Sequence, residues 1–206
     1  MTDIKSLLRT QYAERLPEWL AATPHAPDLL ACNIINLGWP AGKTVAVYWA
    51  SKYEVPTRNI IRALVRQGLH IALPRVDVVG EPMTFRAWQF NDDADNNFGL
   101  ERDARRMWAP SISAAAVNPD YILVPLTAFD GDTLHRIGKG GGDFDRTLRR
   151  QRVINPYVQC IGLALAAQQA HTPWPVESTD EPLDLVVTER EVIRTKAVKP
   201  PKGLAV

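Results

Sequence analysis

The chain has 206 residues, of which 46% are hydrophobic and 23% charged, and its formal net charge is +1. This length favours a single large core, and the balanced charge excludes the strongly basic surface that attracts nucleic acid or acidic membranes. The charged N-terminus lacks a signal-peptide core, and no apolar run is long enough to span a membrane. We therefore expect a monomeric, cytoplasmic protein with a small-molecule partner and with neither a nucleic-acid nor a membrane partner.

Alternating apolar strands and amphipathic helices occupy the first half of the chain. The expected order is helix, helix, strand, helix, strand: Asp3 to about Leu20, DLLACNIINLGW, TVAVYWA, VPTRNIIRALVRQGL and HIALPRV. Asp3 and Thr57 are the candidate N-caps of the first and third helices. A helix between two short apolar strands predicts a parallel pair with a right-handed crossover.

The second half continues the same alternation. PMTFRAWQF alternates and is expected to be an edge strand, and the polar stretch from Asn91 to Asn118 to be a long irregular connection. Three buried strands and one helix then follow: DYILVPLTAFD, QCIGLALA and LDLVVTER, with FDRTLRRQRVI as the helix. The pattern predicts the α/β class, with a single three-layer, Rossmann-like domain over residues 1–194, a mainly parallel sheet and a loose C-terminal tail at 195–206.

Ligands of such sheets gather at the carboxyl ends of the strands. Three segments follow strands in this way: Tyr48 to Glu54, the residues after Phe129, and the glycine-rich stretch RIGKGGGDFD from Arg136 to Asp145. No Ser-His-Asp order or Cys-His pair is present, so covalent catalysis is not expected. Cys32 and Cys160 lie far apart among apolar residues, which favours reduced, buried thiols.

The glycine-rich stretch has the composition of an anion site. Its glycines, Gly138, Gly140, Gly141 and Gly142, allow backbone amides to turn inward, and a helix starting near Phe144 adds its positive end. Lys139 and Arg136 bring positive charge, and the Asp145 carboxylate suits a magnesium ion bridging phosphate oxygens. The combination indicates a nucleoside triphosphate, although it matches neither the Walker nor the dinucleotide pattern. The competing interpretation is a tight turn without a ligand.

Motifs in order along nearly the whole chain resemble the 5-formyltetrahydrofolate cyclo-ligase family. They are Lys5-Ser6-Leu7-Leu8-Arg9, Glu54, Leu73-Pro74-Arg75, Met83 to Arg86, Val124 to Asp130, Arg136 to Gly142 with Asp145-Arg146, and Pro175-Val176-Glu177, Asp180, Asp184 and Val187-Thr188-Glu189. The resemblance implies an ATP-dependent cyclisation of 5-formyltetrahydrofolate to 5,10-methenyltetrahydrofolate, with release of ADP and phosphate. Two alternatives stay open: a relative that acts on another amide-bearing substrate, and a non-catalytic folate- or nucleotide-binding regulator.

The resemblance also implies roles for individual residues. The ATP-binding set is Lys5, Arg9, Arg136, Gly138, Lys139, Gly140, Gly141, Gly142 and Phe144. The folate set is Trp49, Glu54 and Asp143, and the magnesium ligands are Asp145 and Asp180. On pattern alone, each role competes with a structural one: Lys5 and Arg9 as a solvated helix face, Trp49 as core, Asp145 as a helix cap and Asp180 as a turn residue.

The sequence departs from the family at several positions near these motifs. Asp143 stands where many members carry an aromatic residue, so a carboxylate replaces one aromatic wall of the site. Lys139 stands where Tyr, Arg or Phe is common, and we expect it to take over a phosphate contact. Arg102, Arg105 and Arg106 replace a short Pro-rich connection, and the expected partner of these arginines is the glutamate tail of a folate.

Overall fold

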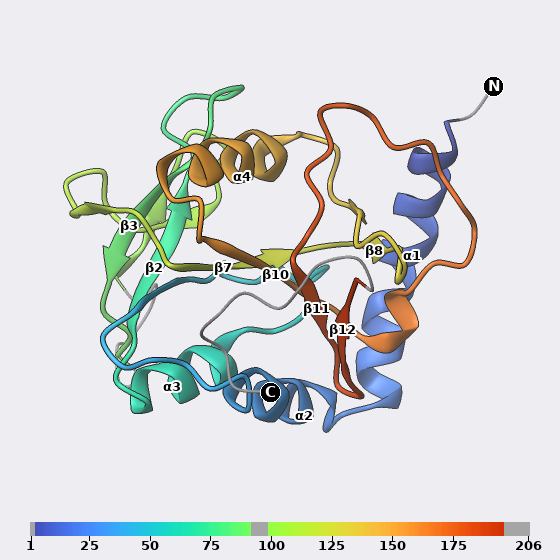
Figure 1. Cartoon of the computed structure of the whole chain (residues 1–206), viewed down its shortest axis with the longest axis horizontal. Helices are drawn as coiled ribbons and strands as arrows, with labels where there is room; N and C mark the ends of the chain where they lie inside the picture. The colour runs from blue at the N-terminus through green and yellow to red at the C-terminus, as the bar shows by residue number, and fades with distance from the viewer. Residues whose placement is uncertain (1–2, 92–98, 196–206) are drawn as a thin grey trace.

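The computed structural model describes residues 3–91 and 99–195 (Figure 1). Its main sheet has eight strands in these residues, in the order β12-β11-β10-β7-β1-β2-β3-β6. They are β1 (Thr44–Ala46), β2 (His70–Arg75), β3 (Thr84–Trp88), β6 (Ala116–Val117), β7 (Tyr121–Pro125), β10 (Gln159–Leu163), β11 (Leu185–Val187) and β12 (Val192–Arg194). The strands from β11 to β2 run parallel, while β12, β3 and β6 are antiparallel to their neighbours. The predicted mainly parallel sheet is confirmed.

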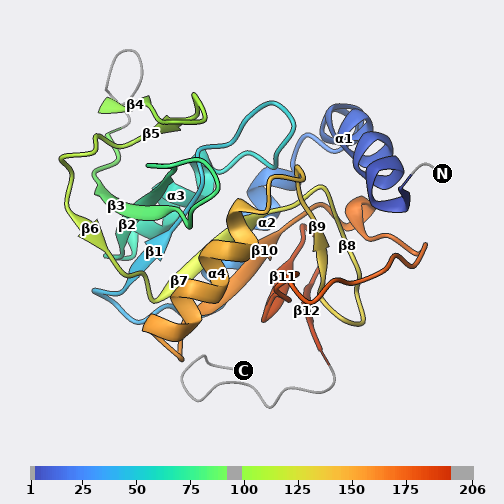
Figure 2. The same ribbon diagram turned by 90° about the horizontal axis from the view of Figure 1, so that it is seen from above.

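Helices cover both faces of this sheet, as the three-layer prediction requires. They are α1 (Ile4–Ala22), α2 (Ala26–Ile35), α3 (Arg58–Arg66) and α4 (Asp143–Ile154), with a short 3-10 helix, η2, at Ala166–Gln168. In Figure 1, α2 and α3 lie on one face and α4 on the other, and Figure 2 shows α4 lying over β7 and β10. Because strand side chains alternate between the two faces, Val45 and Leu123 pack toward α2 and α3, whereas Ala46 and Ile122 pack toward α4.

Three predicted features differ in the structure. Thr57 is the N-cap residue of α3, as expected, but its hydroxyl donates to the Tyr48 carbonyl at 2.8 Å and makes no capping hydrogen bond. β3 is not an edge strand, because β6 pairs with its outer side. Cys32 is exposed, and only Cys160 is buried. In each case the outcome depends on a tertiary neighbour that local sequence does not specify.

The connection predicted as irregular from Asn91 to Asn118 contains regular structure. Residues 92–98 lie outside the described part, but β4 (Glu101–Arg102) and β5 (Trp108–Ala109) form an antiparallel hairpin, and β6 follows. The buried Asp103 carboxylate holds the hairpin turn by accepting the N–H groups of Arg105 and Met107 at 2.9 Å. The hairpin therefore presents a fixed turn at residues 103–107.

Two further predictions, the loose C-terminal tail and the absence of a membrane span, are tested only in the described part of the chain. Residues 196–206 of the expected tail lie outside the described residues, and the boundary at 194 stays a prediction. Within residues 3–91 and 99–195, no helix has the length and apolar character needed to cross a bilayer.

The strand order creates a crevice between β1 and β7. From β1 the chain passes through α3 to β2 on one side, and from β7 it passes through α4 to β10 on the other. Such a reversal leaves an opening at the carboxyl ends of the two central strands, where ligands of α/β sheets bind. The loops that follow β1 and β7 are therefore positioned to form a site.

Asp120 connects the starts of β7 and β1, and its contacts make the stability of the fold depend on pH. Its carboxylate accepts the Lys43 ammonium at 2.8 Å and the Thr44 N–H at 2.9 Å. Burial raises the pKa of Asp120, but these hydrogen bonds outweigh burial and hold the pKa below its ordinary value of 3.8. A carboxyl group with a lowered folded-state pKa stabilises the fold above its unfolded pKa, and this stabilisation disappears as the pH falls through the folded pKa.

Asp120→Asn is therefore expected to lower the free energy of unfolding near neutral pH. The difference from wild type should shrink as the pH falls below about 4, where the unfolded carboxyl group protonates. Urea titrations of both proteins across this range measure the difference. A difference that stays constant down to the lowest pH would contradict the assignment.

Candidate functional site

A cavity of about 730 Å³ occupies the crevice. Its walls come from α1, the loop after β1, the end of β7, the glycine-rich loop with the start of α4, and the β4–β5 hairpin. Every residue predicted for the site lines it: Lys5, Arg9, Trp49, Glu54, Arg136, Gly138, Lys139, Gly140, Gly141, Gly142, Asp143, Phe144, Asp145 and Asp180. The structure thus brings the whole predicted set together, while the role of each residue stays a prediction.

One face of α1 closes the cavity. Asp3 caps this helix by accepting the Lys5 N–H, as expected. The Lys5 Nζ lies 2.8 Å from Asp180 Oδ2 and 3.0 Å from Glu177 Oε1, and Lys5 is only 8% exposed. Burial lowers the pKa of Lys5, but the two carboxylates outweigh burial and raise it. The solvated-face interpretation is therefore wrong for Lys5.

Arg9, one helical turn after Lys5, faces the glycine-rich loop. Its Nε donates to the Gly138 carbonyl at 2.9 Å. Because residues four apart share a helix face, Lys5 and Arg9 present two cations from one side of the cavity. They lie against different partners, the turn at residues 177–180 and the glycine-rich loop.

The loop between β9 (Arg136–Ile137) and α4 needs glycine for its backbone. Gly140 has φ +93° and Gly142 has φ +65°, a region that L side chains rarely adopt. A Cβ on Gly142 would lie 2.7 Å from Arg146 Nη1. Gly142 is also the N-cap of α4, so the N-terminal amides of this 12-residue helix border the cavity. This arrangement suits an anion.

The buried Arg136 pairs with the partly exposed Asp145 beside this loop. The Arg136 side chain is 3% exposed, and its Nη2 lies 2.8 Å from Asp145 Oδ1 while its Nη1 donates to the Glu181 carbonyl at 2.7 Å. Burial lowers the pKa of Arg136, and Asp145 opposes this effect. Asp145 lies inside the first turn of α4, so it is not the helix cap. Arg136 therefore fixes Asp145 at the cavity wall.

Asp145 and Asp180 are the predicted magnesium ligands and the residues of the cavity wall that could hold this ion. Both carboxylates line the cavity, and in the described residues each uses one oxygen for hydrogen bonds, Oδ1 of Asp145 and Oδ2 of Asp180. Burial raises the pKa of Asp180, but hydrogen bonds from Lys5 and the Glu177 N–H outweigh it, and the pKa is lowered. No group of three His, Cys, Asp or Glu side chains suited to a metal occurs in the described residues. Two carboxylates completed by phosphate oxygens and water suit Mg²⁺.

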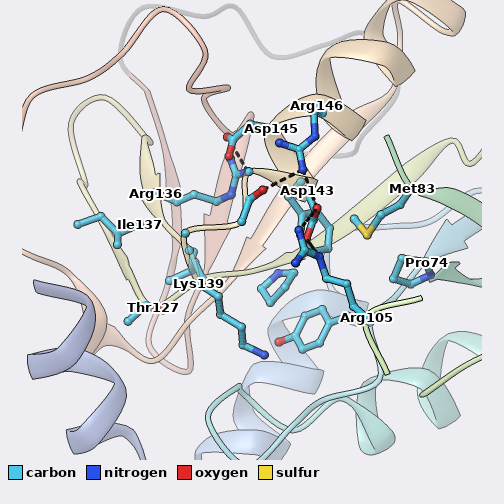
Figure 3. A pocket seen from close by; sticks show the side chains of 18 of the residues that line it. Pro74, Met83, Arg105, Thr127, Arg136, Ile137, Lys139, Asp143, Asp145 and Arg146 are labelled. Atoms are coloured by element: carbon cyan, nitrogen blue, oxygen red, sulfur yellow. Dashed lines mark hydrogen bonds and ion pairs between the residues drawn. The ribbon is translucent and has the colours of Figure 1, made fainter. Parts of the chain in front are cut away.

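Asp143 holds two arginines together at the cavity wall (Figure 3). Its Oδ2 lies 2.7 Å from Arg105 Nε, and its Oδ1 accepts Arg105 Nη2 at 3.0 Å and Arg146 Nη2 at 2.7 Å. Arg105 is the only one of the three hairpin arginines that lines the cavity. The Arg102 guanidinium instead lies 3.7 Å from the Trp108 ring centroid. The hairpin and the glycine-rich loop are thus joined by a forked ion pair.

A second connection crosses the cavity from the glycine-rich loop to the loop after β1. The Lys139 Nζ lies 2.9 Å from Glu54 Oε1 and 3.2 Å from Ser51 Oγ. Trp49, on the same loop, is half-buried and packs edge-on against Trp88 with centroids 5.7 Å apart. Lys139 therefore contacts Glu54, the carboxylate that is predicted to bind the folate.

Sequence reasoning missed several residues of the wall. Met107, Trp108 and Arg149 line the cavity although no role was predicted for them, whereas Tyr48, Thr127 and Arg146 belong to segments or motifs that the sequence had singled out. The spacing of the first three carries no signal, because they reach the cavity only through the turn of the hairpin and the direction of α4.

Comparison with known proteins gives a consistent result. The family model described as the 5-formyltetrahydrofolate cyclo-ligase family matches residues 2–189. A 5-formyltetrahydrofolate cyclo-ligase of Haemophilus influenzae is 31% identical over 156 residues, which cover 70% of this chain and 75% of that protein. The Escherichia coli K12 protein of the same name is 32% identical over 154 residues, or 72% of this chain and 79% of that protein.

Solved structures show the same fold. A 5,10-methenyltetrahydrofolate synthetase of Aquifex aeolicus has a TM-score of 0.73 at 23% identity, covering 97% of both chains. The Mycoplasma pneumoniae protein of that name has a TM-score of 0.67 at 20% identity, covering 90% of this chain and 99% of the other. Given the nearly full-length family match and the cavity that unites the family's motifs, this chain belongs to the 5-formyltetrahydrofolate cyclo-ligase family.

Proposed function

We propose that this chain catalyses the ATP-dependent cyclisation of 5-formyltetrahydrofolate to 5,10-methenyltetrahydrofolate, with release of ADP and phosphate. Family membership supports this activity. The structural observation that supports the activity is a single cavity with two kinds of wall. One wall is the glycine-rich loop, which suits an anion, and the other contains the half-buried Trp49 and the buried Glu54. Such a cavity suits a nucleotide and a ring substrate held side by side.

In the proposed reaction, the formyl oxygen attacks the terminal phosphorus of ATP, and ADP leaves. The second folate nitrogen then attacks the activated formyl carbon and loses its proton to the departing phosphate or to water, closing the ring as phosphate leaves. Phosphoryl transfer of this kind requires positioning and charge neutralisation, and no covalent nucleophile. Cys160 is unsuited to such a role, since burial raises the pKa of its thiol to about 12.

The nucleotide phosphates are assigned to the glycine-rich loop and the start of α4. Backbone amides there bind phosphate oxygens, and Lys5 and Arg9 bring positive charge from α1. Asp145 and Asp180 would hold Mg²⁺, which when bound neutralises charge on phosphate oxygens. Arg136 orients Asp145 through the 2.8 Å ion pair and holds the carboxylate in place.

The folate is assigned to the part of the cavity beyond Lys139. Glu54 accepts N–H groups of the folate ring, and Trp49 supplies an aromatic surface. Asp143 acts on the substrate through Arg105, because its own oxygens are bonded to guanidinium groups. The planar Arg105 guanidinium can stack on a ring or bind a carboxylate, so it compensates for the aromatic wall that Asp143 replaces.

Mixing the purified protein with 5-formyltetrahydrofolate and Mg-ATP tests the activity directly. The expected result is a rise in the absorbance of the methenyl product, and no rise under sensitive conditions would refute the proposal. ADP release across a panel of amide-bearing substrates identifies a relative with another substrate. Tight binding of ATP and folate without product would instead favour a regulator.

The remaining expectations from the sequence stay predictions. They are a cytoplasmic location, a monomeric state and the absence of nucleic-acid and membrane partners. The small formal net charge of +1 supports a small-molecule partner over a polyanion.

A further inference from the structure

Lys139 is the side chain through which the glycine-rich loop contacts the loop after β1. Figure 3 shows it extending from the loop away from Arg136 and Asp145. Its Nζ lies 2.9 Å from Glu54 Oε1, although the two residues are far apart in sequence. The lysine side chain is 54% exposed, whereas the Glu54 side chain is 9% exposed. A cation on a flexible stem therefore compensates a carboxylate that is fixed and almost buried.

The Glu54 carboxylate has a limited capacity for further partners. Its Oε2 already accepts the Ser51 N–H at 2.8 Å, and its Oε1 faces the Lys139 ammonium. A ring substrate that donates N–H groups to Glu54 must share this carboxylate with the lysine. Without Lys139, Glu54 would be a buried charge in need of donors, which strongly favours a ligand that supplies them.

The same ammonium lies next to an anion site. Lys139 stands between Gly138 and Gly140 in the loop that borders the N-terminus of α4. A triphosphate carries several negative charges against the single charge of Glu54, and a lysine stem rearranges readily. Phosphates bound at the loop would therefore compete with Glu54 for the ammonium.

We propose that Lys139 is shared between the two substrates and couples their binding. Nucleotide at the glycine-rich loop draws the ammonium away from Glu54, and the released carboxylate then accepts the folate N–H groups more strongly. Nucleotide thus raises the affinity for folate, and by thermodynamic reciprocity folate raises the affinity for nucleotide by the same factor. This inference rests on the proposed function, because it uses the same two ligands.

Calorimetric titration of the full chain with 5-formyltetrahydrofolate tests the coupling. The Kd is measured with and without a saturating non-hydrolysable ATP analogue and magnesium. For wild type, the analogue is expected to tighten folate binding by about tenfold, within the usual range of coupling between sites. In Lys139→Met the ratio of the two Kd values should fall to about 1, and the Kd without analogue should itself decrease because the competitor of the folate is gone.

Two further variants separate the coupling from general effects. Lys139→Gln keeps a polar, hydrogen-bonding side chain without the charge, and it should abolish the coupling in the same way. Lys52→Met is the matched control, because Lys52 is an exposed lysine of the same loop as Glu54 and lies over the Tyr53 ring. This control should keep the wild-type ratio.

The outcomes distinguish the inference from the proposed function. A tenfold ratio that persists in both Lys139 variants, or a wild-type ratio of 1 with both ligands bound, would overturn the coupling alone. Wild-type protein that binds neither folate nor the analogue would overturn the proposed function, and the coupling with it.

Discussion

Asp145→Asn is expected to lower the rate of cyclisation by about 100- to 1,000-fold while the fold is retained. The asparagine oxygen can still accept the Arg136 guanidinium and the Glu181 N–H, which contact Asp145 Oδ1 at 2.8 Å and 3.2 Å. The variant loses the negative charge that the proposed Mg²⁺ requires, so the charge on the phosphates is poorly neutralised during transfer. The absorbance of the methenyl product, followed over a range of magnesium concentrations, measures the effect.

Asp132→Asn provides the control for this substitution. Asp132 is an exposed aspartate of the turn between β8 (Ala128–Phe129) and β9, and it does not line the cavity, so its variant should keep the wild-type rate. Unchanged kinetics of Asp145→Asn at limiting magnesium would rule out the metal assignment. Alanine at 145 is a poorer choice, because it removes the partner of a buried guanidinium and lowers stability as well.

Arg136→Met should lower the free energy of unfolding by about 1–3 kcal/mol. The substitution removes the buried guanidinium that binds the Asp145 carboxylate and the Glu181 carbonyl. Both acceptors then lose a partner, although Asp145 keeps the Glu181 N–H and is 27% exposed at the cavity wall. Equilibrium unfolding in urea, monitored by tryptophan fluorescence, gives the change.

Arg149→Met is the matched comparison, since Arg149 also contacts residue 181 but, unlike the buried Arg136, is itself largely exposed. Its side chain is 51% exposed, and its Nε lies 2.9 Å from Glu181 Oε1. Exposed ion pairs contribute about 1 kcal/mol or less, so this variant should be nearly as stable as wild type. Equal losses for the two variants would show that burial of Arg136 does not govern the stability of the pair.

Elements whose signal is local were predictable from the sequence. The Asp3 cap and the helical spacing that follows it gave α1, and apolar runs separated by a helix gave the parallel pair of β1 and β2. The burial pattern of these elements repeats over a few residues, so a short window is sufficient. By contrast, β12 and β6 were not predicted, because two- and three-residue edge strands are specified by the neighbour they pair with.

The same distinction applies to the site. At Gly140 and Gly142 the residue type alone indicates that the backbone can adopt a positive φ, as it does in the structure. Residue type does not predict the partners of the charged residues, because these partners are far apart in sequence. Lys5 and Glu177 are separated by 172 positions, and Arg105 and Asp143 by 38. Composition therefore predicted the glycine-rich part of the site and the family resemblance implied the rest, whereas only the folded chain shows which charges are paired.

The forked pair between Arg105 and Asp143 has an evolutionary consequence. An aromatic residue introduced at 143 alone would leave the Arg105 and Arg146 guanidinium groups close together without the carboxylate between them. A change at 105 alone would remove the hairpin's ion pair with the loop. Each single step is unfavourable, so positions 105 and 143 are expected to covary among relatives, with arginine accompanying the acidic residue.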